Sequence, residues 1–295
     1  MSVSPAVPAD TAAGIRIETS WQAARRRFLK HKMAVVGLIM LGLLFFSAVF
    51  APWITPYPPN AVDIFHILAA PSPAHLLGTD EVGRDVLTRL IYAGRISLSI
   101  GVAVALSASI VGTLVGAIAG YVGGTVDILL MRFVDMMLSV PFLFFLLLFD
   151  TLFKPSVPLL ILVIALFSWM SLARIVRAEF LSLKTREFIE AARSEGASDI
   201  RIIIYHLLPN AMASIIVFAT LQVAAAIYVE SVLSFLGFGV QAPTASWGSM
   251  LNQSQQYLWT QPLLAVYPGI MILITGLSVN LVGDGLRDAL DPKQR

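Results

Sequence analysis

The segment Glu190-Ala191-Ala192-Arg193-Ser194-Glu195-Gly196 is charged and compact, and it lies between long apolar stretches of the chain. Arg186 stands four residues before Glu190 and Arg193 three residues after it, so both side chains can meet the carboxylate on one helix surface. Gly196 suits the end of that helix, where a positive φ is often required. Leu208 and Pro209 follow twelve and thirteen residues after Gly196. The pattern predicts a helix, a glycine turn and a second helix.

The second helix is predicted to begin at Ser198, which suits an N-cap, with Asp199 in the first turn. Pro209 either ends this helix or opens the next apolar span. The apolar positions of this amphipathic helix recur at i, i+3, i+4 and i+7, and they are Ile200, Ile203, Ile204 and Leu207.

The first helix has a short apolar stripe of its own, formed by Phe188, Ile189 and Ala192. Such a stripe can seat in a groove on a cytosolic partner. The alternative is a surface hairpin that only joins two membrane spans.

The rest of the chain is predicted to be all-α, a polytopic bundle of membrane helices. Of the 295 residues, 57% are hydrophobic and 13% are charged, whereas a soluble domain has about 25% charged residues. The chain has no cysteine, which excludes disulfides, thiolate metal sites and cysteine nucleophiles. The four scattered histidines show no metal-ligand spacing, so no metal site is predicted, and no basic patch indicates nucleic acid.

Apolar runs predict about six transmembrane helices, each near the ~20 residues needed to cross the hydrocarbon. Their predicted ranges are 33–55, 93–120, 125–149, 157–178, 210–236 and 262–283. The second contains Gly112, Gly116 and Gly120, four residues apart on one face, which allows close approach of another helix. We expect packing within the chain, with a subunit contact as the alternative.

Lysine and arginine set the predicted orientation. They are dense before the first span, between the fourth and fifth spans, and after the sixth, and sparse in the three loops on the other side. The positive-inside rule therefore places both termini and the Glu190 segment in the cytoplasm. Residues 1–20 are predicted to be a disordered cytoplasmic tail. They are not a signal peptide, because the first long apolar run starts only near Met33 and is long enough to stay in the membrane.

The predicted organisation then follows along the chain. Residues 21–55 form a basic entry and the first transmembrane helix, and residues 56–92 form a periplasmic loop. A core follows over 93–295, with a cytoplasmic loop at 182–209 and a periplasmic loop at 237–261. Within the last loop a short interfacial helix is expected from about Ser246 to Leu258.

The Glu190 segment resembles the EAA motif of ABC importer permeases, with Glu190-Ala191-Ala192, then Gly196, then Leu208-Pro209 at the motif's distance. His206 departs from the isoleucine of the general motif, and the His-x-Leu-Pro-Asn form is typical of the peptide-importer branch. Further segments resemble that branch: His75–Asp85, Ser234–Gly239 with Trp247-Gly248, and Gly283–Asp288. From about residue 21 to the end, the chain is similar to the C-type permeases of dipeptide, oligopeptide and nickel importers (the OppC/DppC family).

This resemblance implies the type I importer permease fold in the bacterial inner membrane. It also implies a heterodimer with a homologous B-type permease, two ABC ATPase subunits and an extracytoplasmic peptide-binding protein, with membrane lipid around them. ATP and Mg²⁺ would bind the ATPases, because none of the five lysines here follows a glycine and no P-loop is present. The chain itself is expected to hold no cofactor and no catalytic residue. Peptides are the expected substrate, and nickel chelates, glutathione or opines are the alternatives.

The resemblance also assigns roles to residues. Coupling to the ATPases is expected at Glu190, Ala191, Ala192, Arg193, Gly196, His206, Leu208 and Pro209.

A stand-alone secondary transporter is the competing class, but it would need more ionisable residues near the midplane or paired broken helices. A membrane enzyme is less favoured, because no span holds a His/Asp/Glu cluster.

Three ionisable residues are predicted at membrane depth, and charges there face partners or water. Arg132 and Asp135 are three residues apart and are expected to pair with each other, either structurally or along the pathway. Glu230 is a candidate for lining the pathway, where it would attract a peptide amino terminus. A hydrogen bond between packed helices is its alternative role.

The outside loops hold the candidates for a gate or for docking of the binding protein, which are Asp80, Arg84, Asp85 and Trp247. With His75, the first three have two other interpretations. One is a metal or catalytic cluster, and the other is a folded plug held by local ion pairs.

Overall fold

The computed structural model describes residues 20–142, 144–145, 148, 152–153 and 156–290. Its helices are α1 (Ser20–Lys30), α2 (Lys32–Val49), α3 (Ala51–Ile54), α4 (Val86–Val122), α5 (Gly124–Ser139), α7 (Val157–Leu183), α8 (Glu187–Ser194), α9 (Asp199–Ile202), α10 (Leu208–Phe235), α11 (Trp247–Ser254) and α12 (Leu263–Leu290), with a π-turn at Ile203–Leu207 and a 3₁₀ turn at Gln255–Tyr257. No strand occurs in these ranges. The all-α prediction is therefore confirmed.

Five helical runs are long and apolar enough to cross a membrane, and they lie at Lys32–Val49, Val86–Val122, Val157–Leu183, Asp199–Phe235 and Leu263–Leu290. This agrees roughly with the expected six. The predicted third span, 125–149, differs most, because α5 has only 16 residues and ends at Ser139. Val140 is extended, with ψ 124°, as the residue before Pro141 is biased to be. Several residues of 143–151 lie outside the described ranges.

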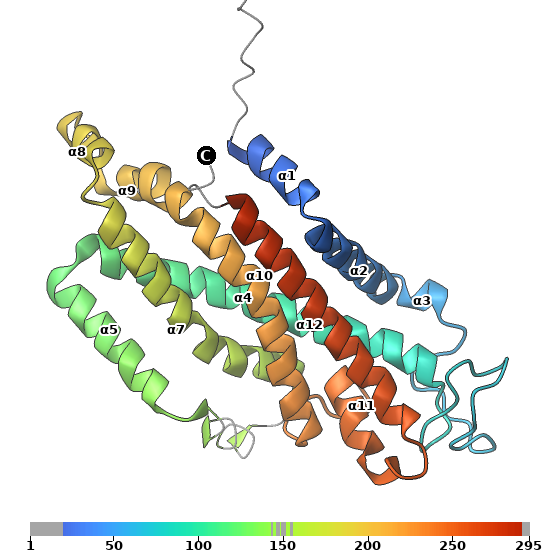
Figure 1. The fold of residues 1–295 in the computed structure, drawn as a ribbon. Coiled ribbons are helices and arrows are strands. Elements are labelled where there is room, and N and C mark those ends of the chain that lie inside the picture. The colour runs from blue at the N-terminus through green and yellow to red at the C-terminus, as the bar shows by residue number, and fades with distance from the viewer. Residues whose placement is uncertain (1–19, 143, 146–147, 149–151, 154–155, 291–295) are drawn as a thin grey trace, which may run out of the picture.

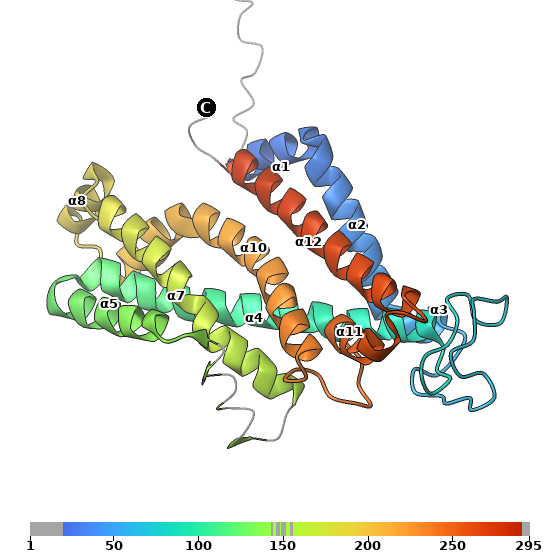
Figure 2. The ribbon, with the colours of Figure 1, turned by 60° about the horizontal axis from the view of Figure 1, so that its bottom comes forward.

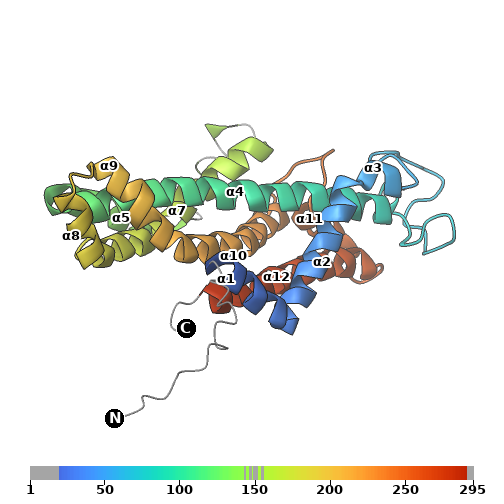
Figure 3. The ribbon, with the colours of Figure 1, turned by 90° about the horizontal axis from the view of Figure 1, so that it is seen from above.

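Helix α4 is the axis of the fold. Its 37 residues extend roughly 55 Å, well beyond the ~30 Å hydrocarbon layer. Figure 3 shows α4 running the length of the molecule, with α5, α8 and α9 at one end and α3 and the loop after it at the other. We call these the coupling end and the loop end. In Figure 1 α1 and the C-terminal end of α12 lie on the same side as α8 and α9.

The three spaced glycines of α4 seat α7. A Cβ atom on Gly112 would lie 2.7 Å from the Trp169 carbonyl oxygen, one on Gly116 would lie 2.5 Å from that of Ala173, and one on Gly120 would lie 2.6 Å from the Phe180 Cβ. Only glycine lets the two backbones approach this closely. The prediction of packing within the chain is confirmed. Helix α10 crosses α4 and contacts α12, which in turn packs on α2 (Figure 2).

The long helices differ from their predicted ends. Helix α4 starts at Val86, not near residue 93, because the Asp85 carboxylate caps it by accepting a hydrogen bond from the Thr88 amide at 2.8 Å. Helices α7 and α12 continue to Leu183 and Leu290, beyond the predicted 178 and 283. Because α4 begins at Val86, the first outside loop is shorter than the predicted 56–92.

Candidate functional site

The Glu190 segment forms the predicted helix and glycine turn. Helix α8 ends in a Schellman motif: the Gly196 amide donates to the Arg193 carbonyl and the Ala197 amide to the Ala192 carbonyl, both at 3.0 Å. Gly196 has φ +82°, and nothing lies within 4 Å of a Cβ atom added to it. The glycine is therefore required by backbone conformation and not by crowding.

The second predicted helix does not stop before the membrane span. Helix α9, the π-turn and α10 form one helical run from Asp199 to Phe235. Pro209 has no N–H, and its ring would clash with a carbonyl of the preceding turn in a regular helix. In the wider turn before it, the Leu208 amide donates to the Ile203 carbonyl. Pro209 therefore opens α10 without breaking the run.

Two of the three residues of the α8 apolar stripe, Ile189 and Ala192, face their own chain, while Phe188 is exposed, so the predicted seat on a partner is left to Phe188 and stays a prediction. Ile189 has no exposed surface and Ala192 is 8% exposed. Ile189 packs in a cluster that includes Phe180 of α7 and Leu207 of the π-turn. The apolar side chains that face outward at this end are Phe188, Ile200, Ile204 and Tyr205. Of the four apolar positions predicted on one face of the second helix, Leu207 is buried and Ile203 half-buried, while Ile200 and Ile204 are exposed.

Polar contacts tie the coupling end to α4. The Tyr121 hydroxyl donates to the Asp199 carboxylate, and the Arg193 guanidinium lies 5.9 Å from the centre of the Tyr121 ring. The Lys184 ammonium donates to the Gly120 carbonyl at 3.0 Å. Movement of this segment would therefore be transmitted to the end of α4.

The residues predicted to meet the ATPases have different exposures. Glu190, Ala191, Arg193, Gly196 and Pro209 are exposed, His206 and Leu208 are half-buried, and Ala192 is buried. The His206 ring lies 6.5 Å from that of Phe188. Contact with an ATPase stays a prediction for all of them.

At the loop end, the residues before α4 form a compact knot of ion pairs. The Arg84 guanidinium donates to the Asp80 carboxylate at 2.7 Å and to that of Glu81 at 2.9 Å, and Arg89 lies 3.4 Å from Asp80. His75 contacts Asp85 at 3.0 Å. These are the local ion pairs that the plug interpretation expects. No group of three His, Asp or Glu side chains in the described ranges has metal-binding geometry.

One carboxylate in the exposed part of the same loop, that of Asp63, has a shifted pKa. The Asp63 carboxylate accepts hydrogen bonds from His66 and from the Phe65 amide. The His66 bond is the larger cause that lowers the pKa of Asp63 below its ordinary value.

Trp247, a docking candidate, faces inward. Its indole nitrogen donates to the Leu90 carbonyl at 3.1 Å, and the side chain is 1% exposed. Gly94 makes room for the ring, since a Cβ atom there would lie 2.9 Å from it. The predicted short helix is confirmed as α11, capped reciprocally by Ser246 and Ser249. In this conformation Trp247 anchors α11 to α4.

Glu230 lies at the centre of a buried polar network. It has no exposed surface, and its carboxylate accepts hydrogen bonds from Ser97 of α4 at 3.2 Å and from Ser234 at 2.7 Å. The Ser97 oxygen accepts from the Trp247 amide at 3.2 Å, and the Ser234 oxygen from the Val240 amide at 3.0 Å. Glu230 therefore joins α4, α10 and the loop leading to α11. Its role in lining the pathway stays a prediction.

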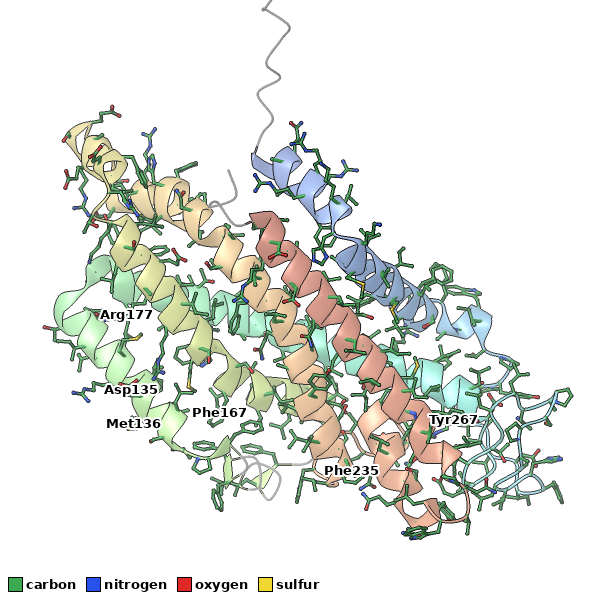
Figure 4. The ribbon with its side chains drawn as sticks, in the orientation of Figure 1. Asp135, Met136, Phe167, Arg177, Phe235 and Tyr267 are labelled. Carbon is green, nitrogen blue, oxygen red and sulfur yellow. The ribbon has the colours of Figure 1, made fainter. Side chains whose placement is uncertain are left out.

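The predicted Arg132–Asp135 pair is wrong. Asp135 pairs with Arg174 of α7 at 2.5 Å. Eight residues earlier on α5, the Asp127 carboxylate accepts hydrogen bonds from Nε and Nη2 of Arg177. Figure 4 places Asp135 and Arg177 at different heights of the α5–α7 pair. The carboxylates of α5 reach across to α7 because that helix packs beside them, while Arg132 is exposed.

Arg95 was not among the predicted candidates, although it lies inside the predicted span 93–120. A charged residue within an apolar run is the feature of the sequence that would have identified Arg95 as a candidate. Its side chain is exposed on α4 and lines a pocket of about 310 Å³ with Pro59, Asn60, Tyr92, Ile96 and Pro243–Ala245.

Two segments of the chain match known protein families. Residues 112–295 match the family described as "Binding-protein-dependent transport system inner membrane component". Residues 19–71 match the "N-terminal TM domain of oligopeptide transport permease C". The chain is 46% identical to the oligopeptide transport system permease protein OppC of Escherichia coli strain K12 over 277 residues, which cover 93% of this chain and 92% of that protein.

A second relative is the glutathione transport system permease protein GsiD of Shigella flexneri serotype 5b. It is 42% identical over 279 residues, which cover 94% of this chain and 92% of that protein. Among solved structures, the fold resembles a chain of the MetNI methionine ABC transporter in an inward-facing conformation. The TM-score is 0.59 at 18% identity, and the match covers 70% of this chain and 97% of the other.

Proposed function

The chain belongs to the family of binding-protein-dependent inner-membrane transport permeases, and from this premise we propose that it imports short peptides across the bacterial cytoplasmic membrane. It would form half of the membrane pathway with a homologous permease and would be driven by two separate ATPase subunits. The oligopeptide relative at 46% identity supports the peptide substrate. The glutathione relative at 42% identity supports glutathione, itself a tripeptide, as the alternative substrate.

One observation carries the mechanism: the segment from Asp199 to Phe235 is a single helical run. It joins the coupling end to the Glu230 network through continuous helix, interrupted in its regular pattern by the π-turn at Ile203–Leu207. Since Glu230 lies 31 residues after Asp199, the two residues are separated by roughly 47 Å along the helical run. A shift of α8 and α9 would therefore be transmitted to the contacts that α10 makes with α4 near the loop end.

In the proposed cycle, the ATPases close on ATP and Mg²⁺ and displace α8 and the π-turn segment. Helix α10 tilts, and its contacts with α4 and with the loop before α11 rearrange to open the pathway toward the binding protein. Nucleotide shifts such an equilibrium only through its differential affinity for the two states. The chain has no P-loop, so the chemistry of hydrolysis is assigned to the partner subunits and not to this chain.

The proposed orientation places the coupling end in the cytoplasm, with both termini, and the loop end in the periplasm. The exposed apolar side chains Phe188, Ile204 and Tyr205 of the coupling end supply the surface that an ATPase groove would cover. A stand-alone secondary transporter does not account for this separate coupling surface.

The test compares Gly196→Trp with Gly196→Ala in the reconstituted importer. Both variants place a side chain on φ +82° and carry similar backbone strain, but neither meets an atom of its own chain at the Cβ position. The two differ in bulk beyond the Cβ atom, and Gly196 is exposed, so this bulk is added at the surface that a docked ATPase would cover. We expect the tryptophan variant to assemble and hydrolyse ATP without peptide uptake, and the alanine variant to keep most of its uptake. Normal uptake by Gly196→Trp would contradict the lever mechanism.

A further inference from the structure

The pocket around Arg95 has an unpaired cation in its wall. Arg95 lies nine residues after Val86, roughly 14 Å along α4, near where this long helix would enter the apolar layer. Within the described ranges, the Arg95 guanidinium has no ion pair and no side-chain hydrogen bond. A charge at this depth is costly unless it meets a partner or a water-filled cavity, so the guanidinium indicates one of these.

The direction of Arg95 is fixed by the packing of α4. Ser97, two residues later, is fully buried and binds Glu230 at 3.2 Å on the opposite face of the helix. Trp247 fills the space over Gly94 and binds the Leu90 carbonyl. Rotation of α4 is therefore restrained, and Arg95 is held outward beside Tyr92 and Ile96.

The other two walls of the pocket are also tied in place. Residues 243–245 precede Trp247, whose amide donates to the Ser97 oxygen at 3.2 Å. With the Asn60 side-chain amide turned so that its nitrogen faces the Pro243 carbonyl, that nitrogen donates to the carbonyl at 3.0 Å, which joins the first outside loop to this wall. Three segments distant in sequence thus enclose one pre-formed pocket.

The residues that line the pocket indicate the chemistry of the ligand that it can bind. Pro59, Ile96, Pro243 and the Tyr92 ring form an apolar collar around one guanidinium, and a guanidinium binds carboxylates in a planar two-pronged geometry. At about 310 Å³ the pocket is at the small end of ligand sites, so it fits the end of a peptide and not a whole oligopeptide. We propose that Arg95 and this pocket form a subsite that binds the C-terminal carboxylate of a peptide as it enters the pathway.

This inference rests on the proposed function, and it goes further by naming the group of the substrate that the permease recognises. The test uses the complete importer in proteoliposomes. It measures uptake of a tripeptide with a free C-terminus and of the same tripeptide with a C-terminal amide, each delivered by the binding protein at saturation. The quantity compared is the uptake of each peptide by a variant relative to the unsubstituted importer.

We expect Arg95→Gln to lower uptake of the free-acid peptide about tenfold, the loss typical of one charge-assisted hydrogen bond, and to leave uptake of the amide unchanged. Arg95→Lys should lose less. Arg25→Gln, the same change at an exposed arginine of α1, should affect neither peptide. An equal loss for both peptides would overturn the inference, because Arg95 would then serve assembly or an acidic side chain of a partner subunit.

A second variant keeps the test decisive if Arg95→Gln assembles poorly. The chain has no cysteine, so Arg95→Cys gives this subunit a single thiol. Labelling it with 2-aminoethyl methanethiosulfonate restores a positive charge, and 2-sulfonatoethyl methanethiosulfonate adds a negative one, with the labelled unsubstituted importer as control. The positive label should restore preference for the free acid and the negative label should not. Equal preference with both labels would overturn the inference alone, whereas failure of the unsubstituted importer to take up either peptide would overturn the proposed function as well.

Discussion

The Ser97 hydroxyl on α4 donates a hydrogen bond to the Glu230 carboxylate on α10 over 3.2 Å, across a sequence separation of 133 residues. The same hydroxyl oxygen accepts from the Trp247 amide. One pair of side chains therefore connects the central helix, the helix that leads from the coupling end, and α11. In the proposed cycle these contacts must be remade when α10 tilts.

The stability lost when Glu230 is replaced should depend on how many hydrogen-bond acceptors the substitution removes. Glu230→Ala leaves the buried Ser97 and Ser234 hydroxyls without their acceptor, at about 1–3 kcal/mol each, whereas Glu230→Gln keeps one carbonyl oxygen and should cost less. Thermal unfolding of the purified protein measures both. Glu179→Ala, which removes a half-buried acceptor of Ser214, is the matched control and should change least. Unchanged peptide uptake by Glu230→Gln would exclude a charge requirement in the pathway.

Added bulk at Gly116 should force α4 and α7 apart. A Cβ atom there lies 2.5 Å from the Ala173 carbonyl oxygen, which belongs to the backbone and cannot rotate away. We expect Gly116→Ala to destabilise the protein by about 1–3 kcal/mol. Gly42→Ala on α2 meets nothing within 4 Å and should be neutral or stabilising by up to ~1 kcal/mol. Equal melting temperatures for the two variants would contradict the packing described here.

The contact between Asp135 and Arg174 should appear as a coupling energy. We expect Asp135→Asn and Arg174→Gln to be non-additive in a double-mutant cycle of unfolding, by a few tenths to about 1 kcal/mol for a half-exposed pair. The cycle of Asp135→Asn with Arg132→Gln is the comparison and should be additive. Coupling to Arg132 and not to Arg174 would restore the pairing predicted from sequence.

The proposed orientation can be tested with single thiols in this cysteine-free chain. Phe65→Cys and Trp259→Cys replace side chains that are 86% and 97% exposed at the loop end. A membrane-impermeant maleimide added to spheroplasts should label both. Ile200→Cys, whose native side chain is 70% exposed at the coupling end, should react only after the membrane is opened. Labelling of Ile200→Cys from outside would reverse the proposed topology.

Much of this protein could be predicted from short stretches of its sequence. Most of the apolar runs, the glycine face of α4, the turn at Gly196 and the short helix α11 were confirmed. Each depends on local properties: the length of an apolar run, a positive φ, a side chain that reaches an amide three residues away. Such properties operate within one helix or its end, so neighbouring residues contain the information.

Tertiary structure decided the partners and the directions of polar side chains. Asp135 pairs with an arginine 39 positions away and not with one three positions away. The Trp247 indole donates to the Leu90 carbonyl across 157 positions, and Ile189 and Ala192 of the α8 stripe pack on their own chain while Phe188 faces outward. These outcomes depend on how each helix is rotated and which helix crosses it. The pocket of Arg95 could not be predicted from neighbouring residues for the same reason. It forms only where α4 meets one loop that precedes it and another that lies far later in the chain.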